Sequence, residues 1–162
     1  MLITDLGLSE PLVRALSQFD EATPVQVAAI PAVLTGRDLL VTARTGSGKT
    51  TAFVLPILES WWAASQSKPK RLHALILVPT RELAAQVREV IQGYARELPE
   101  RIKVVSAVGG VSINPQMMAL RGGADVIVAT PGRLLDLVDH NAVSLEEVGT
   151  LVPDEADRML DL

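Results

Sequence analysis

The chain has 162 residues, a formal net charge of −4, 48% hydrophobic residues and no cysteine. The lack of cysteine excludes disulfides and thiolate metal sites. The negative charge excludes a protein that binds nucleic acid through bulk charge alone. No apolar run approaches the roughly 20 residues that span a bilayer, and the N-terminus does not read as a secretory signal. We therefore expect a single soluble, cytoplasmic domain over residues 1–162, with no membrane contact.

The first predicted element is a helix from Leu8 to Phe19, with Ser9 as its N-cap and Pro11 in its first turn. Five short aliphatic runs follow and read as strands. They are nearly continuous in apolar residues rather than alternating, which is typical of parallel strands covered on both faces. These runs are residues 38–43, 73–79, 102–108, 124–130 and 149–153.

Helix-forming segments separate these runs and carry apolar residues at steps of three and four. They cover residues 48–62, 80–99, 114–122 and 131–140. Repeated strand-helix-strand units with right-handed crossovers predict an α/β fold with a central, mainly parallel sheet and helices on both faces. The one dense basic run, residues 68–71, reads as a solvated loop.

Residues 43–50, Ala-Arg-Thr-Gly-Ser-Gly-Lys-Thr, follow a predicted strand and open a predicted helix. Gly46 and Gly48 can adopt backbone angles that other residues avoid, so successive N–H groups can point at phosphate oxygens. In this pattern Lys49 reaches the β and γ phosphates, and the Thr50 hydroxyl holds Mg²⁺. A glycine-rich turn with a surface lysine is the alternative, but it leaves the flanking strand and helix unexplained. The segment predicts a phosphate-binding loop.

Three carboxylates, Asp154, Glu155 and Asp157, lie directly after the last predicted strand. A sheet that carries a phosphate loop needs an acidic strand end that faces the metal. We expect Asp154 to hold Mg²⁺ largely through water, and Glu155 to position and deprotonate the attacking water. Pro153 removes one N–H from this strand. Either that N–H faces no neighbour or the strand end is distorted, and we expect Pro153→Leu to raise thermal stability.

Residues 154–157 spell Asp-Glu-Ala-Asp, and with the phosphate loop the chain resembles the N-terminal RecA-like domain of a DEAD-box ATP-dependent RNA helicase. Four further segments carry the resemblance in order along the whole chain. Residues 23–26 (Thr-Pro-Val-Gln) resemble the end of the Q motif, 79–84 motif Ia, 109–110 the glycine doublet and 130–133 motif Ib. The resemblance implies a RecA-like P-loop domain, with a Q motif region in residues 1–30 and the phosphate loop to the DEAD motif in residues 38–162.

The resemblance implies ATP or ADP with Mg²⁺ as cofactors. It implies that Gln26 hydrogen-bonds the adenine edge, that Thr23 shapes the pocket, and that Asp157 couples the ATP site to the next motif of the family. The catalytic residues are then Lys49, Asp154 and Glu155. The implied cofactor-binding set is Thr23, Gln26, Arg44, Thr45, Gly46, Ser47, Gly48, Lys49, Thr50 and Thr51.

The resemblance also implies single-stranded or duplex RNA as a partner, held through its sugar-phosphate backbone with weak sequence preference. For residues 79–86 alone, a capped amphipathic helix is the alternative. The implied RNA-binding residues are Pro79, Thr80, Arg81, Gly109, Gly110, Thr130, Pro131, Gly132 and Arg133.

Besides Pro153, which stands where the family has an aliphatic residue, four positions depart from the family pattern. Ile3 stands where an adenine-stacking aromatic residue is usual, and Arg44 replaces a common glutamine. Gln18 and Ala22 stand where glycine and proline are usual. We expect an adenine pocket that works but is less tightly built.

By this resemblance the chain is part of an enzyme that couples ATP hydrolysis to local unwinding or remodelling of RNA duplexes. It ends a few residues after its acidic cluster, which predicts a fragment without the Ser-Ala-Thr motif and without the C-terminal RecA-like domain that is its expected partner. Arginine fingers from that domain contribute roughly 10³ to 10⁵ in rate in related reactions. We therefore expect the isolated chain to be nearly inactive.

Three alternatives stay open at this point. An ATP-gated RNA clamp with little unwinding uses the same residues. A small-molecule P-loop kinase is disfavoured by residues 79–84 and 130–133, and a DNA helicase is disfavoured by the complete Asp-Glu-Ala-Asp sequence.

Overall fold

The computed structural model describes residues 1–65 and 72–160, so the basic run at 68–71 lies outside the described residues. The chain forms two compact units, Met1–Gln66 with Val90–Arg101 and Ser67–Glu89 with Ile102–Leu162. The boundary between them falls within helix α4 (Arg81–Ala95). Within residues 1–65 and 72–160, no helix is long and apolar enough to cross a bilayer.

The first unit is helical. It contains a 3₁₀ turn η1 (Ile3–Leu6) and helices α1 (Glu10–Ala15), α2 (Pro24–Leu34) and α3 (Lys49–Ser65). Helix α1 begins after Ser9 as predicted, although the Ser9 hydroxyl makes no capping bond and its N–H donates instead to Glu59 at 2.9 Å. The helix ends earlier than predicted because residues 17–20, Ser-Gln-Phe-Asp, include weak helix formers.

The second unit contains the sheet. Its strands are β1 (Ala74–Leu77), β2 (Val104–Ala107), β3 (Val126–Ala129) and β4 (Thr150–Pro153), all parallel and in the order β2-β3-β1-β4. Each lies inside an apolar run that predicted it. The helices of this unit are the first turns of α4 together with α5 (Asn114–Ala119), α6 (Pro131–Asp139) and α7 (Ala156–Leu160).

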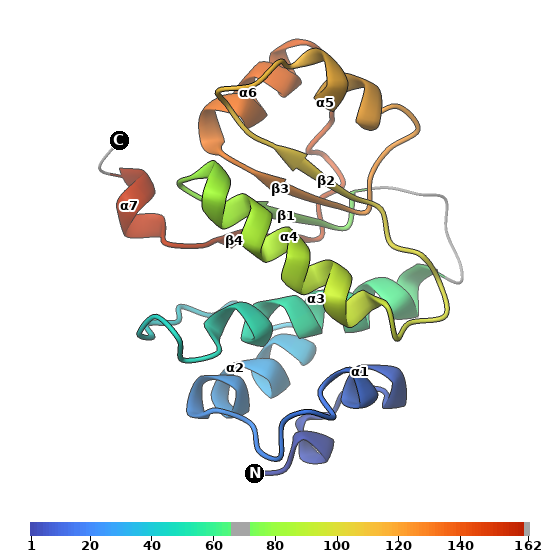
Figure 1. Ribbon diagram of the computed structural model, residues 1–162, viewed down its shortest axis with the longest axis vertical. Coiled ribbons are helices and arrows are strands. Elements are labelled where there is room, and N and C mark those ends of the chain that lie inside the picture. Colours follow the sequence, from blue (N-terminus) through green and yellow to red (C-terminus); the bar gives the residue numbers. More distant parts are fainter. Residues whose placement is uncertain (66–71, 161–162) are drawn as a thin grey trace. The chain divides into compact units, whose positions relative to one another are not determined.

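The direction of each crossover connection determines on which face of the sheet its helix lies. The chain runs one way across the sheet from β1 to β2, and the other way from β2 to β3 and from β3 to β4. Because such crossovers are right-handed, α4 lies on one face of the sheet and α5 and α6 on the other (Figure 1). The second face is a buried apolar cluster that joins Leu75 and Ile127 of the sheet to Leu134 and Leu137 of α6. The predicted parallel sheet with helices on both faces is therefore confirmed.

One predicted strand is wrong. Residues 38–43 form no strand in the structure, and the side chains of this run are exposed rather than buried, with Leu40 97% exposed. The apolar residues of this segment suit a strand, but a strand also needs a neighbouring strand that pairs with its backbone N–H and C=O groups. Within the described residues this segment pairs with no strand, so it stays outside the sheet.

Candidate nucleotide and nucleic-acid sites

The predicted phosphate loop has the backbone geometry that anion binding needs. Gly46 and Gly48 have φ angles of 80° and 84°, in the left-handed region that favours glycine. The 17-residue helix α3 begins at Lys49, so its free N–H groups and positive end lie directly after the loop. The loop and first turn thus fit a phosphate chain, with Lys49 and Thr50 at the helix start.

Gln26 ties helix α2 to this loop. Thr23 and Gln26 form a capping box, in which the Gln26 Oε1 atom accepts the Thr23 N–H at 3.0 Å. The Gln26 Nε2 atom donates to the Gly48 carbonyl at 3.3 Å. Each polar end of the amide thus makes one hydrogen bond, which leaves one N–H and one oxygen lone pair for reading an adenine edge. The spacing Thr-Pro-Val-Gln was the signal for helix α2, which the sequence interpretation did not predict.

A cavity of about 670 Å³ opens beside the loop, within the usual range for small-molecule sites. Its walls come from the start of α2, the unpaired segment before the loop and the loop itself, including Thr23, Arg44, Gly46 and Ser47. Ile3 is not among the lining residues and is only 7% exposed. Its aliphatic side chain is thus used in packing η1 rather than offered to a base.

Thr51 has a partner inside the first unit. Its hydroxyl lies 2.8 Å from the Tyr94 hydroxyl at the end of α4. Thr50, one residue earlier, starts the helix with its side chain partly exposed. Of the two threonines, Thr50 is therefore the better placed to reach a metal-bound phosphate, and Thr51 links two helices.

The acidic cluster follows β4 in the second unit. Asp154 is 5% exposed, and its N–H donates to the Leu77 carbonyl at 2.8 Å, which holds the residue at the end of the sheet. Glu155 has a φ of 54°, unusual for a residue other than glycine, and its carboxylate pairs with Arg158 at 2.9 Å. Asp157 is exposed on α7. A hydroxyl and a carboxylate are each ligands that suit Mg²⁺ beside phosphate and water, so Thr50 in the first unit and Asp154 in the second each carry a group that fits that ion by its chemistry.

Pro153 is accommodated because its missing N–H would face away from β1. The N–H groups of Thr150 and Asp154 donate to β1-side carbonyls, those of His73 at 3.1 Å and Leu77 at 2.8 Å. N–H directions alternate along a strand, so position 153 faces the other edge. Among the described residues β4 pairs only with β1, so no ladder bond is lost and the strand end is not distorted. The premise for expecting Pro153→Leu to stabilise the chain therefore does not hold.

The predicted RNA-binding segments follow three neighbouring strands. Residues 79–81 follow β1, 108–111 follow β2 and 130–133 follow β3, and the carboxyl ends of parallel strands share one edge of the sheet. Two of the segments touch: the Arg81 Nη1 atom lies 3.1 Å from the position that a Cβ on Gly110 would take, and Gly110 has a φ of 79°. A side chain at Gly110 would therefore both strain the backbone and crowd Arg81.

The two threonines at this edge differ. The Thr80 hydroxyl accepts the Leu83 N–H at 3.2 Å and so caps α4. Thr130 is the N-cap residue of α6, but its hydroxyl makes no capping bond. Pro131 and Gly132 form the first turn of that helix. The start of α6 thus offers a hydroxyl and a helix N-terminus at the same edge of the sheet.

Arg81 has an acidic neighbour. Its Nε atom lies 3.3 Å from the Glu82 carboxylate, and both side chains are exposed. A backbone hydrogen bond at the start of α4, and then the Arg81 guanidinium, lower the pKa of Glu82. Glu82 therefore stays ionised at neutral pH and competes with any phosphate for Arg81.

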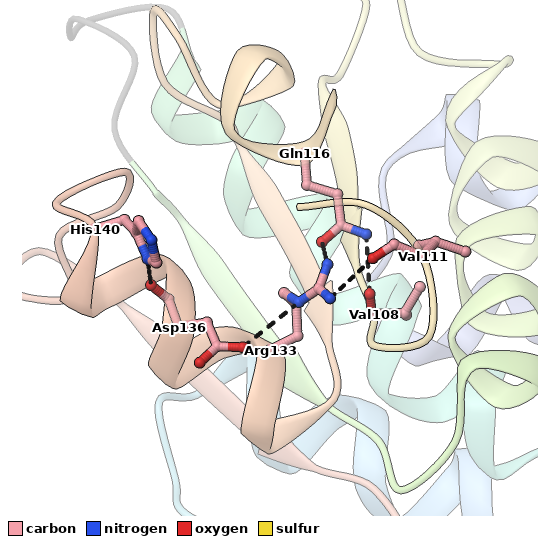
Figure 2. Close-up of polar contacts among 6 residues, drawn as sticks. All are labelled: Val108, Val111, Gln116, Arg133, Asp136 and His140. Atoms are coloured by element: carbon pink, nitrogen blue, oxygen red, sulfur yellow. Dashed lines mark hydrogen bonds and ion pairs between the residues drawn. The ribbon is translucent and has the colours of Figure 1, made fainter. Parts of the chain in front are cut away.

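Arg133 points toward Gln116 and the backbone of Val111 (Figure 2). Its side chain is 11% exposed, against 57% for Arg81. It donates to the Gln116 side-chain oxygen and to the Val111 carbonyl, both at 3.0 Å. Gln116 was missed by the sequence interpretation, although a glutamine one helical turn before buried Leu120 marks a polar group on an apolar face.

Comparison with known proteins decides the family. The family described as DEAD/DEAH box helicase matches residues 23–162, which is most of the chain. The chain belongs to the DEAD/DEAH box helicase family.

Relatives of this family agree with that membership. The chain is 42% identical to the DEAD-box ATP-dependent RNA helicase CshA of Streptococcus pneumoniae, over 100% of this chain and 30% of that protein. It is 47% identical to the DEAD-box ATP-dependent RNA helicase 28 of Oryza sativa subsp. japonica, over 98% of this chain and 20% of that protein. The chain thus spans about a fifth to a third of the length of these curated relatives.

A solved structure supports the fold. The chain superimposes on a hypothetical ATP-dependent RNA helicase from Sulfolobus tokodaii with a TM-score of 0.83 and 36% sequence identity. The match covers 95% of this chain and 43% of that one. The RecA-like α/β fold implied by the sequence resemblance is therefore confirmed.

Proposed function

We propose that this chain is the ATP-binding and RNA-binding half of an ATP-dependent RNA helicase that couples ATP hydrolysis to local unwinding or remodelling of RNA duplexes. The observation that carries the proposal is the common sheet edge in the second unit. There Arg81 contacts Gly110 and Arg133 binds Val111, so three implied RNA-binding segments form one surface. The names of the relatives, which are RNA helicases, support RNA as the partner.

On the nucleotide side, each residue has a stated task. The N–H groups around Gly46 and Gly48 and the Lys49 ammonium bind phosphate oxygens, and the remaining N–H and lone pair of the Gln26 amide select adenine. Thr50 and Asp154 would hold Mg²⁺, largely through water, and the ion would offset the charge that develops on the transferred phosphoryl group. Glu155 orients the attacking water and accepts its proton after the carboxylate turns away from Arg158.

On the RNA side, the contacts are to the backbone. Arg81 pairs with a phosphate, and the start of α6 adds the Thr130 hydroxyl and free N–H groups. Such contacts carry little sequence information, so we expect weak sequence preference. A protein with net negative charge can bind RNA in this way because the donors are few and fixed.

RNA binding tests the proposal directly. The chain is titrated with a fluorescein-labelled single-stranded RNA and with DNA of the same sequence, at low salt. We expect binding to RNA that Arg81→Ala weakens about tenfold or more, the scale of one charged hydrogen bond of about 1.5 kcal/mol. Arg88→Ala is the matched control, because Arg88 is an exposed arginine of the same helix. Binding that is equal for DNA and RNA, or that responds equally to the two variants, contradicts the proposal.

Turnover gives a second test. Arginine fingers contribute roughly 10³ to 10⁵ in rate in related enzymes, and we propose that here they come from the C-terminal RecA-like domain that is the expected partner of this chain. We expect ATP hydrolysis by the chain, with or without RNA, to stay near the background of Glu155→Gln. Rapid RNA-stimulated hydrolysis by the chain alone contradicts the assignment of a two-domain mechanism.

A further inference from the structure

Gln116 and Arg133 hold the loop that follows β2 from both of its ends (Figure 2). The Gln116 Nε2 atom donates to the Val108 carbonyl at 3.0 Å. The Arg133 Nη2 atom donates to the Val111 carbonyl at 3.0 Å. The two side chains are also bonded to each other, from Arg133 Nη1 to Gln116 Oε1 at 3.0 Å. The Gly109–Gly110 doublet therefore lies between two carbonyls, those of Val108 and Val111, that side-chain hydrogen bonds hold in place.

Fixing a carbonyl also fixes the next amide. In a planar trans peptide the C=O of one residue and the N–H of the following residue point in opposite directions, and residues 1–65 and 72–160 contain no cis peptide bond. The Val108 carbonyl points at Gln116, so the Gly109 N–H points away from it. The same holds for the Ser112 N–H, because Arg133 holds the Val111 carbonyl. Within the part of the chain that the structure describes, neither amide donates a hydrogen bond to the protein.

The contacts of Arg133 and Gln116 are nearly all with the protein itself. Its side chain is 11% exposed, and two of its nitrogens donate to protein oxygens. The third, Nε, is buried and lies 3.8 Å from the Asp136 carboxylate, too far for a hydrogen bond. The hydrogen bond from His140 Nδ1 goes to the backbone oxygen of Asp136 and not to its carboxylate. Gln116 is 9% exposed, and both ends of its amide are used. Neither side chain is free to follow a ligand.

We propose that Gln116 and Arg133 act together as a positioning pair that aims the N–H groups of Gly109 and Ser112 at the RNA backbone. Arg133 acts through the loop and is not itself a phosphate ligand, and Gln116 is a functional residue although it touches no RNA. Arg81, exposed beside Gly110, is the residue of this surface that contacts phosphate. The inference rests on the proposed RNA-binding function and assigns new roles within it.

The first experiment measures the loop without RNA. Backbone ¹⁵N order parameters of residues 109–112 are compared in the unaltered chain, Gln116→Leu and Arg133→Lys. Gln116→Leu removes both amide bonds at similar volume, and Arg133→Lys keeps the charge but cannot reach both partners. We expect order parameters of about 0.85 in the unaltered chain and below about 0.6 in both variants. Unchanged values overturn the proposed pair.

The second experiment measures RNA affinity against salt. A short fluorescein-labelled oligouridylate is titrated with each protein over a series of KCl concentrations. We expect Gln116→Leu and Arg133→Lys to weaken binding by similar factors, about fivefold, with the salt slope of the unaltered chain. Arg81→Gln lowers the slope by about 0.7, the value for one phosphate contact on a single strand. Arg88→Gln controls for loss of one positive charge.

The outcomes separate the two claims. If Arg133→Lys binds RNA as the unaltered chain does, or if Arg133→Gln lowers the slope as Arg81→Gln does, Arg133 is a phosphate ligand and the positioning role is overturned. If the unaltered chain binds no RNA while the loop still loosens in the variants, the proposed RNA-binding function fails, and the RNA role of the pair fails with it. If a variant unfolds, the other variant and the salt slope still decide.

Discussion

The two candidate sites of this chain are built by different means. At the RNA side, three segments are set by neighbouring strands, and side chains such as Arg133 then fasten the loops to each other. At the nucleotide side, the segment before the phosphate loop pairs with no strand of the described residues, and Leu40 is 97% exposed. There the loop is held by helix contacts, chiefly from Gln26 to Gly48. A parallel sheet therefore positions one site, and packing of α2 and α3 positions the other.

The test with the largest expected effect compares two leucines, each from an apolar run that was predicted to be a strand. Leu75 in β1 is 4% exposed, and Leu40 is 97% exposed. We expect Leu75→Ala to lower the free energy of unfolding by about 2–5 kcal/mol. Leu40→Ala should change it by less than about 0.5 kcal/mol. Urea unfolding followed by circular dichroism measures both, and a large loss for Leu40→Ala would mean that residues 38–43 are buried in solution.

The next test concerns how the helices hold the phosphate loop. Gly46 and Gly48 share a positive φ, but a Cβ on Gly48 would lie 2.5 Å from Gln26 Nε2, whereas a Cβ on Gly46 meets nothing within 4 Å. Both alanine variants should lose about 1–2 kcal/mol of stability to backbone strain. Gly48→Ala should also displace Gln26 and remove the preference for ADP over GDP. Preserved nucleotide selectivity in Gly48→Ala contradicts the link between Gln26 and the loop.

A smaller effect is expected at the edge of the sheet. Pro153 is exposed and its missing N–H faces away from β1. Pro153→Leu gains no bond to β1 and gives the unfolded chain more freedom. We expect the melting temperature to stay the same or fall by a few degrees, since about 1 kcal/mol shifts a domain of this size by about 2–4 °C. A clear rise in melting temperature would show that the N–H at position 153 finds an acceptor.

The smallest effect concerns the competition for Arg81. The pKa of Glu82 is lowered, so its carboxylate is charged throughout the neutral range and pairs with Arg81. Because exposed ion pairs are weak, we expect Glu82→Gln to tighten RNA binding only about twofold. Gln86→Glu, which adds a charge at an exposed position of the same helix, is the opposite control. Weaker binding in Glu82→Gln would mean that Glu82 orients Arg81 rather than competing for it.

The sequence predicted what depends on local pattern. Four of the five predicted strands form, because their apolar runs lie in one sheet, and Gly46 and Gly48 adopt the angles that the phosphate-loop pattern requires. The family membership that the motifs indicated is also confirmed.

What the sequence did not reveal depends on partners in space. Residues 38–43 have the apolar composition of a strand, but only the structure shows whether a neighbouring strand pairs with their backbone hydrogen-bonding groups. The sequence indicated that Pro153 could distort its strand, and only the structure showed that its missing N–H would face away from β1. Arg133 was predicted to bind RNA, and only the structure shows that it also bonds to Gln116 and Val111, which lie 17 and 22 positions away along the chain. Such pairings arise from the fold and leave no mark in local spacing.

The central claim is that the phosphate loop and Gln26 form one adenine nucleotide site in this chain. The most direct test is a calorimetric titration of the chain with Mg-ADP and with Mg-GDP, repeated with Lys49→Ala and Gln26→Ala. We predict tighter binding of ADP, loss of that preference in Gln26→Ala, and weakening of both nucleotides by about 100-fold in Lys49→Ala. Lys103→Ala, a lysine of the other unit, should bind as the unaltered chain does. Equal affinity of the unaltered chain for the two nucleotides, or unchanged binding in Lys49→Ala, would contradict the account.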